Sequence, residues 1–274
     1  MKKRSILWWL LFVGSLAVLV FSLVNIGLFF WQAHVAKEVQ AQTVKTYVQK
    51  GGAELPPSLP SSEPSGDPTT PTTPAESMPD VPELRDRIDF SGLKQVNRDV
   101  AAWVAIPALP ATSFPVIWCG DDETYLHKGW EGDYNWYGSI FLEGMNNPDF
   151  GDLHAIIYGH NMLDGTMFGT LEAFKEEEFY RQNSPYVIIY TPNHVMLYEI
   201  FSVEYTEGTD EDVYNVVFAD DAEYAAFVAE LKSRSLYDTG VEVSGKDQVL
   251  TVSTCAYIFD DARFVLHAKQ VWAR

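Results

Sequence analysis

The sequence predicts a mainly β domain that follows an N-terminal membrane helix and a linker. Residues 6–31 form an uncharged run, and prolines, serines and threonines dominate residues 51–82. Most of the remaining chain consists of short apolar runs separated by Gly, Pro and Asn. Many short strands punctuated in this way are typical of a closed or nearly closed antiparallel sheet. We therefore expect three parts: residues 1–31, 32–80 and 81–274.

The first part is predicted to be an uncleaved signal anchor. The basic residues Lys2, Lys3 and Arg4 precede 26 residues without a charged side chain. At about 1.5 Å per residue, a helix of this length exceeds the hydrocarbon core of about 30 Å. A cleaved signal peptide is the alternative, but its apolar region would be about 7–15 residues long. The basic residues favour a cytoplasmic amino terminus, with the rest of the chain outside.

The charge of the exported part argues against nucleic-acid binding. Of the 19 Lys and Arg residues, 16 follow the apolar run, whereas all 38 Asp and Glu residues follow it, which leaves a formal charge near −22. Such a surface repels phosphate backbones.

The second part is expected to be a stalk followed by an unstructured spacer. Residues 34–50 are predicted to continue the helix with polar residues. Residues 51–82 contain too little apolar surface to fold, and their prolines keep a chain extended. About 30 such residues reach about 90 Å, so we expect a domain that works away from the membrane.

The third part is predicted to contain eight strands and four helices. The helix expected near residue 221 has Asp220 or Asp221 as its N-cap, and its apolar side chains recur at helical spacing. The expected strands are residues 102–106, 114–118, 138–142, 153–158, 186–190, 195–203, 249–254 and 263–271. The expected helices are residues 82–89, 91–99, 167–179 and 221–235.

The last two strands suggest a chemical site. If they pair as a hairpin centred on Phe259, Cys255 lies opposite Arg263 and Ser253 lies opposite Val265, with Cβ atoms about 5 Å apart. A cation beside a cysteine favours the nucleophilic thiolate, and a guanidinium can also bind a developing oxyanion. A buried strand cysteine beside a surface arginine is the alternative interpretation.

A histidine elsewhere in the chain favours the chemical interpretation. The run 153–158 ends in Gly159-His160, which is followed by the turn residues Asp164 and Gly165. This position at the end of a strand is typical of a site residue. A cysteine and a distant histidine are the minimal pair for covalent acyl transfer.

These motifs together resemble the sortase family. The matching segments are Tyr158-Gly-His-Asn-Met162, Met167-Phe-Gly169 and Thr251-Val-Ser-Thr-Cys255, with Arg263 following. The spacing of Asp260-Asp261-Ala-Arg263 and the helical insert before the cysteine strand are similar to class B. Val252 stands where the family usually has leucine, which is a mild change of apolar shape. The resemblance extends over about residues 84–274.

The resemblance implies an eight-stranded sortase barrel that acts as a cysteine transpeptidase. It implies that Cys255 is the nucleophile, that His160 protonates the departing amine, and that Arg263 holds the carbonyl oxygen or oxyanion. We expect no metal and no cofactor. The implied partners are secreted proteins carrying a sorting motif, a cell-wall precursor or pilin amine, and the membrane.

Three further residues are expected to contact the substrate. In class B the segment before the inserted helix borders the substrate groove, which makes Tyr214 the best candidate. Asn97 and Ser253 match groove positions elsewhere, although each is equally well explained as a local hydrogen-bonding residue.

Other histidines and the second cysteine leave alternatives open. His267 is a rival general base, but the hairpin register would place it opposite Thr251, well down the strand from Cys255. His154 is expected to be structural, and the histidines lack the spacing of a zinc site. A disulfide between Cys119 and Cys255 would exclude the nucleophile. An exported cysteine protease and an inactive stalked binding domain remain the alternative functions.

Overall fold

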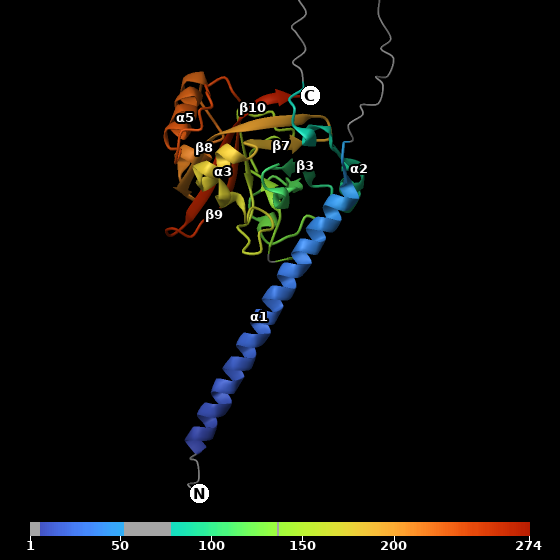
Figure 1. Cartoon of the computed structure of the whole chain (residues 1–274), viewed down its shortest axis with the longest axis vertical. Coiled ribbons are helices and arrows are strands. Elements are labelled where there is room, and N and C mark those ends of the chain that lie inside the picture. The colour runs from blue at the N-terminus through green and yellow to red at the C-terminus, as the bar shows by residue number, and fades with distance from the viewer. Residues whose placement is uncertain (1–5, 52–77, 136) are drawn as a thin grey trace, which may run out of the picture. The chain divides into compact units, whose positions relative to one another are not determined.

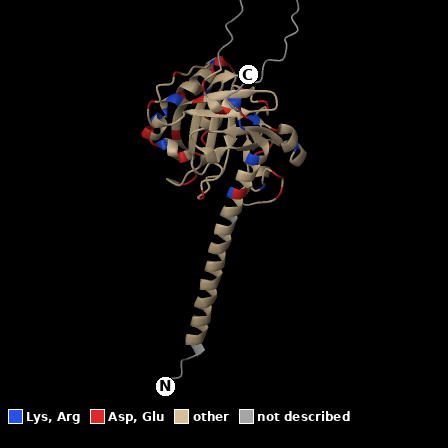
Figure 2. Ribbon diagram, turned by 45° about the vertical axis from the view of Figure 1, so that its right-hand side comes forward, with Lys and Arg blue, Asp and Glu red and all other residues tan. Residues whose placement is uncertain are grey.

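The computed structural model describes residues 6–51, 78–135 and 137–274. The chain divides into two compact units, residues 1–42 and residues 43–274. The first unit contains most of α1 (Ile6–Tyr47). Within α1, the stretch Trp8–Leu28 is long and apolar enough to cross a membrane, and Figure 2 shows it free of charged residues.

The second unit begins inside the expected stalk. After α1 the chain forms β1 (Val48–Gln49), which pairs with β2 (Arg87–Ile88). Lys50 reinforces this pair, because its Nζ lies 2.7 Å from a carboxylate oxygen of Asp86. Residues 43–51 of the predicted 32–80 segment therefore belong to the folded unit.

Most of the spacer expected over residues 51–82 lies outside the described residues, because these exclude residues 52–77. The residues that flank it on both sides belong to the same compact unit.

Eight strands form a closed barrel, as predicted (Figure 1). Their order around the barrel is β10-β8-β7-β3-β4-β5-β6-β9. The strands are β3 (Val100–Ala105), β4 (Phe114–Ile117), β5 (Ile140–Leu142), β6 (His154–Tyr158), β7 (Tyr186–Tyr190), β8 (Val195–Glu207), β9 (Val249–Cys255) and β10 (Ala262–Ala273).

The expectation of a wholly antiparallel sheet is wrong at two places. β4 pairs with β5 in parallel, and so does β6 with β9. Parallel neighbours require a long crossover connection. For β6 and β9 that connection contains two strands and several helices, and it brings distant parts of the sequence to the same edge.

The helices that follow α1 are short except for α5. They are η1 (Pro82–Arg85), α2 (Phe90–Val96), η2 (Pro110–Thr112), η3 (Thr124–Leu126), η4 (Leu171–Lys175), α3 (Glu177–Gln182), α4 (Glu211–Tyr214) and α5 (Asp221–Ser233). The helix expected over residues 167–179 is divided between η4 and α3, because Glu176 between them is extended. Met167 lies outside both helices and has a positive φ of 52°. Asp220 caps α5 as predicted, accepting from the backbone N–H groups of Ala222 and Glu223.

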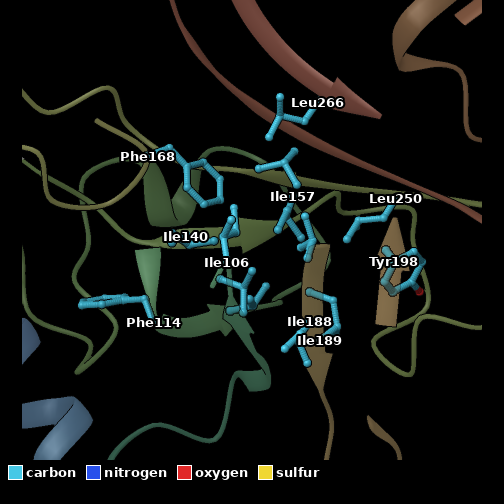
Figure 3. Packing of buried hydrophobic residues seen from close by; sticks show 14 of the residues in the cluster. Ile106, Phe114, Ile140, Ile157, Phe168, Ile188, Ile189, Tyr198, Leu250 and Leu266 are labelled. Carbon is cyan, nitrogen blue, oxygen red and sulfur yellow. The ribbon is translucent and has the colours of Figure 1, made fainter. Parts of the chain in front are cut away.

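Alternate residues of β9 and β10 face two different apolar clusters. Leu250 and Leu266 point into the barrel, where they pack with the isoleucines of neighbouring strands (Figure 3). Val249 and Val265 face the other side and pack beneath α5, which lies outside the barrel beside β8 (Figure 1). The two-residue period of a strand produces this division, and burial on both faces holds the hairpin in one register.

Candidate active site

One cavity of about 220 Å³ collects most of the predicted site residues. It lies where β6, β9 and β10 meet the connection before α4. Its lining consists of Asp122, Leu126, Phe141, Tyr158, Gly159, His160, Gly208, Tyr214, Ser253, Thr254, Cys255 and Arg263. A larger cavity of about 650 Å³ lies elsewhere and contains none of these residues.

The hairpin places Cys255 directly opposite Arg263, as predicted. Ser253 is opposite Val265, also as predicted. The Nη1 atom of Arg263 lies 2.8 Å from a carboxylate oxygen of Asp261 in the β9–β10 loop. This ion pair helps to fix the position of the guanidinium. Both Cys255 and Arg263 are half-buried, so they remain open to the cavity.

Two hydrogen bonds bring His160 to the cysteine strand. Thr254 donates through Oγ1 to the carbonyl of Gly159 at 2.7 Å, and Asn161 donates through Nδ2 to the carbonyl of Cys255 at 2.8 Å. These bonds anchor the residues on either side of His160 to the two residues at the end of β9. Since Asn161 and Cys255 are 94 positions apart, the sequence provides no local signal for this arrangement.

The turn into His160 requires glycine. A Cβ atom at Gly159 would lie 2.5 Å from the ring of Phe168, which is fully buried. A side chain there would displace either that ring or the segment carrying His160. The imidazole itself lies with Nε2 2.9 Å from the carbonyl of Leu126. A carbonyl can only accept, so Nε2 carries a proton in this arrangement.

Aromatic side chains form one wall of the cavity. The hydroxyl groups of Tyr214 and Ser253 are 2.9 Å apart, and the ring of Tyr214 stacks on that of Tyr158 with centroids 6.1 Å apart. Burial raises the pKa of Tyr214 to about 12, so its hydroxyl remains a neutral hydrogen-bonding group. The cavity therefore combines a thiol, a histidine, a guanidinium and a polar aromatic wall. That set suits acyl transfer on a peptide.

The family model of the Sortase domain matches residues 104–271. The chain belongs to the sortase family. Two curated relatives named Sortase B are each 30% identical to it. The one from Listeria monocytogenes aligns with 69% of this chain and 76% of its own length. The one from Staphylococcus aureus aligns with 67% of this chain and 75% of its own length.

Solved structures support the same class. The structure of Clostridium perfringens sortase B has a TM-score of 0.63 and 33% identity, covering 66% of this chain and 99% of that one. Sortase B from Bacillus anthracis, solved in complex with AAEK1, has a TM-score of 0.62 and 31% identity, covering 68% and 85%. The Staphylococcus aureus sortase B–substrate complex has a TM-score of 0.61 and 27% identity, covering 66% and 84%. The class B resemblance seen in the sequence is thereby confirmed.

Asn97 is the one predicted site residue that lies outside this sortase cavity. Its side-chain amide donates to the hydroxyl of Tyr125 at 2.9 Å and to the carbonyl of Trp130 at 2.7 Å. Its side-chain oxygen accepts from the backbone of Asp99. These local hydrogen bonds fit the alternative interpretation of Asn97.

Sequence reasoning did not identify the acidic residue of the cavity. Asp122 lines it from the connection between β4 and β5, and its carboxylate accepts from the backbone of Gly144 at 2.7 Å. Burial, together with the neighbouring carboxylate of Glu143, raises the pKa of Asp122 to about 6. The pair Asp121-Asp122 is the only signal in the sequence, and it does not distinguish a solvated turn from a cavity wall.

The rival residues occupy other environments. His267 and His154 are fully buried, so neither reaches the cavity as a general base. His267 lies opposite Thr251, as the register predicted. Cys119 and Cys255 are both free thiols, which leaves Cys255 available as the nucleophile.

Proposed function

We propose that this sortase is a membrane-anchored cysteine transpeptidase that joins secreted proteins to a cell-wall or pilin amine. The proposal rests on one observation above all, namely that Cys255 and Arg263 face each other at the mouth of the cavity that His160 also lines. Family membership supports the same activity, because sortases are cysteine transpeptidases.

The first half of the proposed reaction forms a thioester. His160 holds the proton from the Cys255 thiol, and the resulting thiolate attacks the carbonyl carbon of the scissile peptide bond, so the carbonyl oxygen becomes an oxyanion. Arg263 stabilises that oxyanion through the donors of its guanidinium. When the carbon–nitrogen bond breaks, His160 gives a proton to the departing amine.

The second half transfers the acyl group. An incoming amine attacks the thioester carbon, His160 accepts a proton from that amine, and the thiolate of Cys255 leaves. The thioester retains much of the free energy of the cleaved peptide bond, so ligation is feasible without another energy source. Water in place of the amine would give the products of a protease.

Substrate recognition is proposed to involve Tyr214 and Ser253, which form the aromatic and polar wall beside the thiol. The structures of class B relatives include a substrate complex and a complex with triglycine. The class B resemblance points to an Asn-Pro-x-Thr-like sorting motif, and the triglycine complex of a relative points to an oligoglycine-like amine, so these are the first substrates to test.

The membrane placement is a second part of the proposal. We infer that Trp8–Leu28 spans the membrane with the basic residues 2–4 in the cytoplasm and the barrel outside. Protease added to intact cells should digest the barrel and spare a fragment that retains the amino terminus. A mature chain beginning after residue 31 would contradict this part.

The activity is tested with the full chain in detergent micelles. The protein is incubated with a library of Asn-Pro-x-Thr peptides, with and without triglycine or a lysine-containing peptide, and products are identified by mass spectrometry. We expect an amide-linked product with an added amine, and none from the Cys255→Ala variant. Hydrolysis alone at every amine concentration would support the protease alternative. The absence of any product would support the binding-domain alternative.

A further inference from the structure

The short helix α4 carries Tyr214, and both ends of this helix are fastened to buried polar groups. At its start, the carboxylate of Asp210 accepts from the backbone of Asp212 at 3.0 Å and from the hydroxyl of Thr206 at 2.7 Å. At its end, Nδ1 of His154 lies 2.7 Å from the carbonyl of Asn215. A helix of four residues has little stability of its own, so these contacts decide where it lies.

The two fastening points belong to one continuous chain of polar side chains. From His154 it passes to Thr251 at 2.7 Å and then to His267 at 2.8 Å. His267 lies 3.0 Å from Glu204, whose second oxygen is 2.8 Å from Nε of Arg234. Arg234 also pairs with Asp210, which returns the chain to the beginning of α4.

Four adjacent strands supply this row. His154, Thr251, His267 and Glu204 come from β6, β9, β10 and β8, and each is at most 2% exposed. They lie between the barrel and the apolar cluster beneath α5, since the rings of His154 and Phe227 are 5.0 Å apart. The proposed chemistry uses none of these groups.

The donors and acceptors of the row fit in one order. The carbonyl of Asn215 can only accept, so His154 carries its proton on Nδ1 and presents Nε2 as an acceptor. Burial lowers the pKa of His154 to about 3, which keeps its ring neutral. Thr251 therefore donates to His154 and accepts from Nδ1 of His267. Nε2 of His267 and the carboxyl group of Glu204 then share one proton. Every side-chain donor and acceptor in the row thus has a hydrogen-bond partner.

We propose that the chain of polar side chains that runs from His154 through the buried row to Arg234 and Asp210 is a clamp that positions Tyr214 for substrate binding. Between its two ends stand only the four residues of α4. Among them Val213 is fully buried in the cluster beneath α5, and Tyr214 turns its hydroxyl to Ser253 in the cavity. The clamp rests on the proposed function, because Tyr214 must contact the peptide. His154, Asp210 and Arg234 are then positioning residues, not catalytic ones.

The competing explanation is that the row only stabilises the fold. Both explanations predict that breaking the row lowers thermal stability. Only the clamp predicts that breaking the row also weakens substrate binding, and that it does so by displacing Tyr214. The chain offers a matched control in Asp220, which caps the neighbouring helix α5 and has the same kind of backbone contacts without touching α4.

The first test is hydrogen exchange on the full chain in detergent micelles. Asp210→Ala should speed the exchange of amides 211–217 and spare those of α5, whereas Asp220→Ala should do the reverse. Asparagine places a donor where histidine has Nδ1, and glutamine does not. His154→Asn should therefore protect residues 211–217 better than His154→Gln. Equal exchange of residues 211–217 in all four variants would overturn the clamp.

The second test is a double-mutant cycle with an internally quenched Asn-Pro-x-Thr peptide. Asp210→Ala should raise KM about fivefold with kcat within about twofold, and Asp220→Ala should change neither beyond about twofold. In a Tyr214→Ala background, Asp210→Ala should add less than about twofold to KM. If Asp210→Ala raised KM by the same factor with and without the Tyr214 side chain, the positioning role would be overturned. Absence of turnover by the wild-type chain would instead overturn the proposed function, and the exchange test would still decide whether the clamp exists.

Discussion

Two pairs of facing residues in the β9–β10 hairpin lie in opposite environments. At the loop end, Cys255 faces Arg263 beside a cavity that also receives His160. Four residues further along β10, His267 faces Thr251 in a row that excludes water. At the cavity the reactive groups remain accessible, whereas in the row each polar atom already has a partner. Access to the cavity, and not residue type, decides which histidine can do chemistry.

The largest expected contrast is between the two histidines. His160→Ala should lower turnover by about 10²–10⁴-fold with little change in stability, because the departing amine loses its proton donor. His267→Ala should lower stability by about 2–4 kcal/mol, because it leaves buried partners unsatisfied. Its kcat at saturating peptide should remain within a few-fold of wild type. Peptide kinetics and near-ultraviolet circular dichroism melting measure the two effects. The comparison fails if both variants, fully folded, lose turnover equally.

Arg263 provides the next contrast, between charge and hydrogen-bond geometry. Arg263→Lys retains the charge but loses the planar fork of donors, so it should lower kcat by about 10²-fold if the guanidinium holds the oxyanion. Arg263→Ala, compared at equal stability, gives the turnover that remains when both the charge and the donors are lost. Near wild-type turnover in the lysine variant would show that charge alone is needed.

Asp122 is expected to make a smaller difference that depends on pH. The folded protein retains a proton on this carboxyl group up to about pH 6, whereas the unfolded chain loses it near the ordinary aspartate value of 3.8. The contribution of Asp122 to stability therefore falls as the pH rises through that window. Asp122→Asn should gain thermal stability relative to wild type between about pH 4 and pH 6. A difference that stays constant across this range would contradict the raised pKa.

Cys119 should show the smallest effect. It is half-buried, burial raises its pKa, and it does not line the cavity that contains Cys255. Cys119→Ala should leave peptide turnover within about twofold of wild type. In the native wild-type protein, iodoacetamide at neutral pH should modify Cys119 slowly. Mass spectrometry of active protein that revealed a Cys119–Cys255 bridge would overturn this assignment.

Several features of the fold were predictable because they depend on neighbours in the sequence. The hairpin register follows from two apolar strands around a short loop, and it placed Cys255 opposite Arg263 and His267 opposite Thr251. The α5 cap at Asp220 follows from local backbone chemistry. Tyr214 and Ser253 came from the class B resemblance, and the structure places both in the cavity. The same reasoning selected Asn97, which the structure places among local hydrogen bonds.

The remaining features depend on contacts between distant segments. The parallel pairing of β6 with β9 brings Gly159 beside Thr254 and thereby fixes His160. The pairing of β1 with β2 returns residues 43–51 to the barrel unit, which composition alone had assigned to a stalk.

The sequence by itself determined the membrane-compatible run, the strands, the family and the three catalytic candidates. Local backbone preference, hydrophobic periodicity and motif spacing are properties of short segments, so they can be read without a fold. Only the tertiary structure decided that His154 and His267 join a buried row while Asp122 joins a cavity wall. Burial and hydrogen-bond partners arise when segments far apart in the chain meet, and no short segment contains that information.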